Sequence, residues 1–285
     1  MRPPSPSIPE REFTLEALKQ SLRVDGRAPL DMRAVELTFG PELGWVECSL
    51  GKTRVLAHVD ATMVKPPPER PLEGLITIHS EISPMASSEY ESGRASEEEV
   101  IITRMLEKVL RRSDAVDRES LCVLAGQRIW HLRLTVHFLA DAGNMLDCAC
   151  IAGITALKHF RRPDVEVIGD EVTIHDPAER APVPLSMHHT PFCLTFAYFS
   201  SPGTPTPIAI LDPTRLEQTL CTGTLSIALN AQRELCVLQK AGGVPLAPDE
   251  IMRIVRIGVE KVKEIDRLVE RRLKEDWAGR RVEGR

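Results

Sequence analysis

Apolar side chains recur at helical spacing in residues 96–112, which form the clearest amphipathic helix that the chain predicts. Ser96 stands where an N-terminal cap belongs, and Glu99 completes a Ser-x-x-Glu capping box. Positions three and four residues apart share one face of a helix, so the apolar positions make a single buried stripe. This stripe consists of Ile102, Met105, Leu106 and Val109.

The same periodicity predicts four further helices. Residues 10–22 and 214–220 should form short ones, and Met145–Leu157 is apolar on nearly every side, as expected of a helix buried in a core. A long helix should run from about Pro248 to Asp276, spanning about 40 Å at 1.5 Å per residue. Its apolar stripe comprises Ile251, Ile254, Val255, Gly258, Val262, Ile265 and Leu268.

Short apolar runs between these helices predict strands, several of them with an alternating pattern. They cover residues 34–39, 44–50, 53–64, 73–82, 129–139, 165–168, 172–174, 193–199, 208–211, 225–230 and 235–239. Strands and a helix, followed again by strands and a helix, predict an α+β fold with two similar halves.

The predicted helices and strands divide the chain into one domain and two terminal segments. The first segment, residues 1–9, is rich in Pro and Ser and is predicted to be a flexible extension. Residues 10–276 form the domain, with halves at about 25–160 and 161–276. Residues 277–285 are left as a C-terminal tail.

The amino-acid composition limits the classes of function that the chain can have. The net charge of −5 means that any contact with nucleic acid needs a local basic patch, and 4% aromatic residues disfavour a base-stacking platform. Seven cysteines with scattered spacing and no C-x-x-C fit reduced, mostly buried thiols better than a disulfide framework or a zinc site. No signal-peptide core or membrane-spanning run is expected.

The segment that follows the strand 129–139 is a candidate anion site. A glycine turn, Asp141-Ala-Gly-Asn144, leads into the helix at Met145, and the free N–H groups of a helix N-terminus suit a phosphate. Yet no cationic or hydroxyl side chain follows Gly143. An ordinary connection, capped by Asp141 or Asn144, is the simpler interpretation.

Asp212 is a candidate metal ligand or acid-base group, because it follows a predicted strand in Leu211-Asp-Pro213. Either task usually needs a second acidic group nearby. The following residues offer only Glu217, on an expected helix face, and Cys221-Thr-Gly-Thr224 contains no acid. The start of a helix at Asp212-Pro213 is therefore the favoured interpretation.

The helix 96–112 has a second face, which is basic. Arg104, Lys108, Arg111 and Arg112 recur at spacings that place them within one sector of an α-helix, roughly 100° wide. Such a row can hold successive phosphates without reading sequence. From the spacing alone, a solvated face remains the favoured interpretation.

Several of these motifs together resemble the RNase PH family in order and spacing, over residues 10–276. They are Arg23-Val-Asp-Gly-Arg27, Gly51-Lys-Thr-Arg-Val55, Arg104 with Leu110-Arg-Arg-Ser113, Asp141-Ala-Gly and Leu211-Asp-Pro213. Longer stretches are similar to a eukaryotic branch, the core ring subunits of the RNA exosome. Those stretches are residues 119–123, 159–165, 169–172 and 184–189.

The resemblance implies an RNase PH-type fold of two βαβ-like halves and a ring of related subunits. It also implies the partners: other RNase PH-like ring subunits, RNA-binding cap subunits, an associated processive nuclease and single-stranded RNA, with no membrane. The expected role is 3′–5′ RNA degradation and processing, including rRNA processing and mRNA turnover. The expected localisation is the nucleus, nucleolus and cytoplasm.

Departures from the family pattern shape the expected activity. Active members carry an Arg after the glycine turn, where this chain has Met145, and an acidic pair where it has Cys221-Thr-Gly-Thr224. The resemblance thus implies a non-catalytic subunit with no catalytic residue, metal or cofactor. With this resemblance, RNA contact becomes the favoured interpretation of the basic row, which consists of Arg104, Lys108, Arg111 and Arg112.

Two alternatives remain open at this point. The first is an active phosphorolytic 3′–5′ exoribonuclease, which would release nucleoside diphosphates from RNA in the presence of phosphate and Mg²⁺. The second is a structural adaptor that never touches RNA.

Overall fold

The computed structural model describes residues 6–91, 93–169, 171–176, 179–200, 207–243 and 245–283. Within these ranges the chain forms two main sheets, several helices between and around them, and two small antiparallel ladders. This mixture confirms the predicted α+β class. None of the helices in the described ranges is both long and apolar enough to cross a bilayer.

The first sheet comes from the N-terminal half of the chain. Its order is β1-β2-β3-β6-β4, with β5 paired to β6, and only the β4–β6 pair is parallel. Every second residue of β2 is buried, because one face of the sheet is turned to the core. The strands are β1 (Val35–Phe39), β2 (Trp45–Leu50), β3 (Thr53–Val64), β4 (Leu75–Ile82), β5 (Cys122–Leu124) and β6 (Arg128–Ala140).

The second sheet comes from the C-terminal half and is entirely antiparallel, in the order β12-β11-β13-β14. Every side chain of β11 is buried, so this strand is covered on both faces. Its strands are β11 (Phe192–Phe199), β12 (Ile208–Leu211), β13 (Gly223–Leu229) and β14 (Leu235–Gly242). The ladders pair β7 (Arg161–Arg162) with β10 (Val183–Pro184), and β8 (Val165–Ile168) with β9 (Glu171–Ile174).

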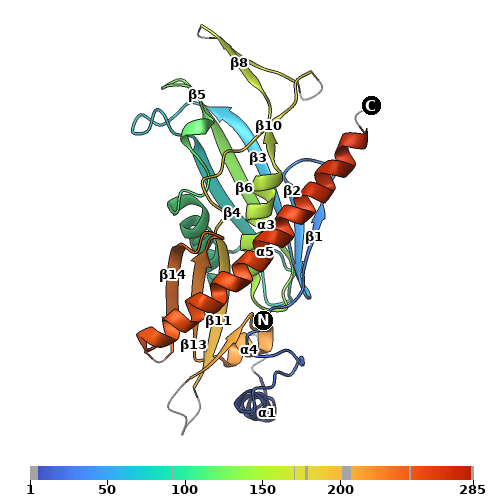
Figure 1. Cartoon of the computed structure of the whole chain (residues 1–285), viewed down its shortest axis with the longest axis vertical. Coiled ribbons are helices and arrows are strands. Elements are labelled where there is room, and N and C mark those ends of the chain that lie inside the picture. Colours follow the sequence, from blue (N-terminus) through green and yellow to red (C-terminus); the bar gives the residue numbers. More distant parts are fainter. Residues whose placement is uncertain are drawn as a thin grey trace.

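Helix α3 (Met145–His159) lies at the centre, packed against β2 and β3 of the first sheet and β11 of the second. Thirteen of its fifteen residues are buried, as its apolar sequence predicts. Helix α5 (Pro248–Glu283) crosses the molecule obliquely and contacts α3 and both sheets (Figure 1). The remaining helices are α1 (Ile8–Lys19), α2 (Glu97–Leu106) and α4 (Arg215–Leu220), with a short 3₁₀ turn η2 (Glu119–Leu121).

The helix predicted over 96–112 is α-helical only as far as Leu106. Ser96 caps α2 as expected, with its hydroxyl accepting from Glu99 N. From Glu107 to Arg112 the chain continues as a π-helix, η1. Val109 and Leu110 of η1 are buried in the core, and the wider turn changes the angle between successive side chains. The four basic residues therefore do not lie on one α-helical row.

The structure also places both chain ends. Ser7 caps α1, which begins at Ile8 inside the predicted extension 1–9, while residues 1–5 lie outside the described ranges. The predicted tail 277–285 is helical as far as Glu283. Arg280 explains this continuation, because it donates to the carbonyls of Gly40 and Pro41 and pairs with Asp276. These contacts hold the last turns of α5 against the loop after β1.

Candidate functional site

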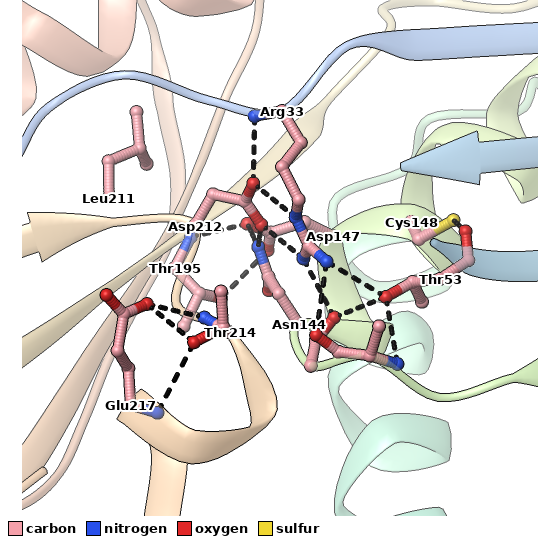
Figure 2. A network of polar contacts seen from close by, with 12 residues as sticks. Arg33, Thr53, Asn144, Asp147, Cys148, Thr195, Leu211, Asp212, Thr214 and Glu217 are labelled. Carbon is pink, nitrogen blue, oxygen red and sulfur yellow. Dashed lines mark hydrogen bonds and ion pairs between the residues drawn. The ribbon is translucent and has the colours of Figure 1, made fainter. Parts of the chain in front are cut away.

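Asp212 is the centre of a buried polar network where the two halves meet (Figure 2). It follows β12 in a left-handed conformation, with φ of 52°, and is fully buried. Its Oδ2 accepts from Arg33 N at 2.9 Å, Arg33 Nε at 2.8 Å and Arg27 Nη1 at 2.9 Å. Its Oδ1 accepts from Arg33 Nη2 and from Asn144 Nδ2, both at 2.7 Å. Burial alone would raise the pKa of Asp212, but these donors hold it below its usual value.

Asp147 is a second buried carboxyl group in the network, in the first turn of α3. It accepts from Asn144 Nδ2 at 2.8 Å, Thr195 N at 2.7 Å and Thr195 Oγ1 at 2.8 Å. Burial raises its pKa to about 7, against the lowering effect of these hydrogen bonds. The single amide of Asn144 thus bridges one ionised carboxylate, Asp212, and one carboxyl that titrates near neutral pH.

These two carboxyl groups are not placed to act on a substrate. Neither has any exposure to solvent, and their oxygens are already engaged by donors from the protein. In the described part of the chain, no group of three or more His, Cys, Asp and Glu residues could hold a metal ion. The network can therefore hold protein segments together, whereas a diffusing substrate cannot reach the two carboxyl groups.

Arg33 connects this network to the turn before α3. Besides Asp212, its guanidinium donates to the carbonyls of Ala142 at 3.1 Å and Gly143 at 2.9 Å. Thr53, in β3, donates to the same Gly143 carbonyl at 2.7 Å. One side chain from the segment before β1 thereby fixes the end of β12 and the entry to α3 together.

A second buried ion pair lies beside the first. Arg23 donates from Nε to Glu217 Oε1 at 3.0 Å and also reaches the carbonyls of Leu211 and Asp212. Glu217 lies on a helix as expected, in the first turn of α4, where it is buried and completes a capping box with Thr214. The predicted start of a helix after Asp212 is thus confirmed, with Thr214 as its cap.

The turn at residues 141–144 differs from the anion-site prediction in its contacts. Asn144 occupies the cap position of α3, but its side chain makes no capping bond because it lies between the two carboxyl groups. Met145 is buried. Gly143 has φ of 93°, and a Cβ there would overlap backbone atoms of residues 214–215. The glycine is therefore required for close packing of α4 against the turn.

Acidic side chains surround the outer side of this turn. Arg215 pairs with Glu89 at 2.9 Å, Glu98 at 3.0 Å and Asp141 at 3.4 Å. Tyr90 donates its hydroxyl to Glu98 at 2.9 Å and to Asp141 at 3.2 Å, and burial raises its pKa, with the neighbouring carboxylates adding to the effect. Three carboxylates around one guanidinium give this region a negative charge, which disfavours an anion.

Of the four predicted RNA-binding residues, one lies in α2 and three lie in the π-helix η1, and their surroundings differ. Arg104 is exposed in α2, whereas Lys108 turns to the second sheet and donates from Nζ to Gln239 Oε1 of β14 at 2.6 Å. Arg111 and Arg112 are exposed at the end of η1, and both line a surface pocket. Their contact with RNA stays a prediction.

Sequence reasoning missed most of the buried network. The segment Arg23–Arg27 was recognised only as a family motif, and Arg33 and Asp147 were not singled out at all. Arg23 and its partner Glu217 are 194 positions apart in the sequence. Arg33 and its partner Asp212 are 179 positions apart, so no local spacing predicts either contact. A carboxyl group in an otherwise apolar helix, Asp147, was the one available hint.

Two family models match the chain in succession. One, described as the 3′ exoribonuclease family, domain 1, covers residues 31–163, and the other, described as domain 2 of that family, covers residues 189–261. The first range contains the first sheet with α2 and α3, and the second contains the second sheet with the start of α5.

Curated relatives are similar over nearly the whole chain. The exosome complex component rrp45 of Schizosaccharomyces pombe is 43% identical over 270 residues, which are 95% of this chain and 91% of that protein. The exosome complex component RRP45 of Homo sapiens is 43% identical over 276 residues, or 97% of this chain. The chain spans only 62% of the length of this human relative.

Solved structures agree on the fold. A chain of the Archaeoglobus fulgidus exosome with RNA bound to the active site matches with a TM-score of 0.76 and 25% identity, over 90% of this chain and 96% of that one. A chain of an archaeal exosome core matches with a TM-score of 0.73 and 22% identity, over 91% and 96%. The RNase PH-type fold expected from the sequence is thereby confirmed.

We predict that Arg33→Met lowers the free energy of unfolding by about 3 kcal/mol, because it leaves the buried Asp212 carboxylate partly uncompensated. Urea unfolding followed by circular dichroism measures the effect. Arg54→Met is the matched control, because Arg54 pairs with Glu47 at the surface, and its substitution should cost less than about 1 kcal/mol. Equal losses in the two variants would show that the Asp212 network is not a main source of stability.

We predict that the stability of Asp147→Asn relative to the unaltered protein shifts in favour of the variant as the pH rises from 4 to 8, whatever the pH-independent cost of placing an amide among these donors. The pKa of Asp147 is raised to about 7 from an ordinary 3.8, so its contribution to stability is complete below pH 4 and is lost as the pH rises through 7. One pKa unit corresponds to about 1.4 kcal/mol, so the shift between pH 4 and pH 8 approaches the order of 4 kcal/mol. Urea unfolding across this pH range measures it, and parallel curves for the two proteins would contradict the assignment.

Proposed function

Since this chain belongs to the RNase PH family of 3′ exoribonucleases, we propose that it is a non-catalytic core ring subunit of an RNA exosome. In this role it helps to close the ring and guides single-stranded RNA to an associated nuclease for 3′–5′ degradation and processing. Its similarity to exosome complex component rrp45 over 91% of that relative supports the assignment. The observation that carries the non-catalytic part is the internally neutralised network around Asp212.

Three features around this network argue against phosphorolysis. Met145, at the position where active relatives are expected to carry an arginine, is buried and uncharged. The nearby carboxylates Glu89, Glu98 and Asp141 would repel inorganic phosphate. Asp212 is fully occupied by arginine and amide donors, so its oxygens are not free to bind a divalent ion.

The finer identity and the remaining partners belong to the same proposal. The subunit is assigned to the branch of the smaller polymyositis/scleroderma autoantigen, on the sequence segments that resemble it. Its partners are a related ring subunit, RNA-binding cap subunits and a processive nuclease. It works in the nucleus, nucleolus and cytoplasm, on substrates that include rRNA precursors and mRNA.

RNA guidance is assigned to the basic residues of α2 and η1. Arg104, Arg111 and Arg112 are exposed, and the half-buried Lys108 is hydrogen-bonded to the amide of Gln239 rather than to a carboxylate. Such groups attract phosphates without reading sequence and act more strongly at low salt. The negative net charge of the whole chain argues that this attraction is effective inside the assembled ring rather than in the isolated subunit.

We predict that Lys108→Glu with Arg111→Glu lowers the affinity of the assembled ring for single-stranded RNA by roughly tenfold at low salt, because two phosphate contacts become repulsive. The ring should still assemble, since a glutamate at 108 can accept a hydrogen bond from the Gln239 amide. Fluorescence anisotropy measures binding, and size-exclusion chromatography measures assembly. Arg133→Glu with Arg256→Glu reverses the same number of exposed charges elsewhere and should change binding little. Loss of the ring, or unchanged affinity, would refute this role.

The competing function is an active phosphorolytic exoribonuclease. We predict that the purified full chain, incubated with RNA, inorganic phosphate and Mg²⁺, releases no nucleoside diphosphate above a phosphate-free blank. The physical reason is the missing positive charge at Met145 and the occupied carboxylate of Asp212. Chromatography of the products measures the release, and phosphate-dependent diphosphate formation would favour the enzyme instead.

A further inference from the structure

A pocket of about 330 Å³ opens at the end of η1, away from the buried network. Its walls come from the loop after β3, from η1 itself and from the segment that follows it. The lining residues are Arg70, Glu107, Arg111, Arg112, Asp114 and Arg118. Four guanidinium groups thus face two carboxylates, so the lining carries an excess of positive charge.

Two of these arginines are held in place by carboxylates. Arg118 donates to Asp114 Oδ1 at 2.7 Å and pairs with Glu73 at 3.0 Å. Arg70 pairs with the same Glu73 at 3.3 Å. The ion pairs neutralise part of the charge, but they also fix the two side chains at the wall before any ligand arrives. Preorganised donors lose less conformational entropy when they bind.

The other two arginines have no such partners. Arg111 and Arg112 are exposed, and within the described ranges no ion pair or hydrogen bond engages their guanidinium groups. They follow the buried pair Val109 and Leu110, so both emerge from the core on the side of the pocket. Their charge is therefore available to an external anion.

We propose that this pocket binds a phosphodiester group of single-stranded RNA, with Arg70 and Arg118 as contacts additional to Arg111 and Arg112. The proposal rests on the RNA-guiding role assigned above and extends it to a defined site. Guanidinium groups present paired donors that match phosphate oxygens, so several of them around one cavity suit a phosphate better than a single charged group would.

The character of the lining favours RNA over an acidic peptide. All six lining residues are charged, so none of them is an aliphatic or aromatic residue that could form the apolar centre typical of protein interfaces. An adjoining pocket shares Arg118 and Asp114 but contains Glu73, Asp117 and Glu119. These acids repel a phosphate on that side, so the RNA backbone is directed toward Arg111 and Arg112.

The test is the double variant Arg70→Gln with Arg112→Gln in the assembled ring, with a fluorescent oligouridylate as the probe. Affinity should fall roughly five- to tenfold at low salt, because two phosphate contacts are lost. The plot of log affinity against log salt should become less steep by about 1.4, at about 0.7 for each contact with a single strand. Arg133→Gln with Arg256→Gln removes two charges outside the pocket and should leave both quantities unchanged.

Three outcomes would overturn the proposal. If this variant binds normally while Lys108→Glu with Arg111→Glu does not, the pocket is not a phosphate site although the RNA-guiding role stands. If both variants bind normally, the RNA-guiding role fails as well. If the variant loses a ring or cap subunit during size-exclusion chromatography, the pocket contacts a protein surface rather than RNA.

Discussion

The buried carboxylate of Asp212, enclosed by the guanidinium groups of Arg27 and Arg33, is the interaction on which the two halves depend. Asp212 ends a strand of the second sheet, whereas Arg33 precedes the first sheet and also binds the turn before α3. A charge without access to water is tolerated only when it is paired. Any sliding of one half against the other would leave this charge unpaired, so the two halves keep one relative placement.

The charged side chains of the molecule fall into two groups, one buried and one exposed. Inside, Arg23, Arg33, Asp212 and Glu217 neutralise one another and hold segments together. Outside, the arginines of η1 have no carboxylate partners in the described part of the chain. A protein built in this way supplies shape and surface charge. The proposed role in a ring that passes RNA to another subunit needs only these two properties.

Much of the fold was predictable because it follows from local periodicity. The Ser96 cap, the apolar helix α3 and the long stripe of α5 were all identified, since each is a repeat within a short segment. The π-helix was not, because the local periodicity of residues 96–112 predicts an α-helix throughout. The role of Asn144 was also missed. Its side chain lies between two carboxyl groups, and only one of them is near it in sequence.

The sequence by itself determined the class of fold, the family, and the presence of an uncharged side chain, Met145, after the glycine turn. These are statements about residue types and spacings, which a chain carries whether folded or not. Only the tertiary structure decided that Asp212 is paired with Arg33, that Asp147 is buried with a raised pKa, and that Arg70 joins Arg112 in one pocket. Pairing, burial and cavity shape depend on distances between residues far apart in the chain, and folding alone fixes those distances.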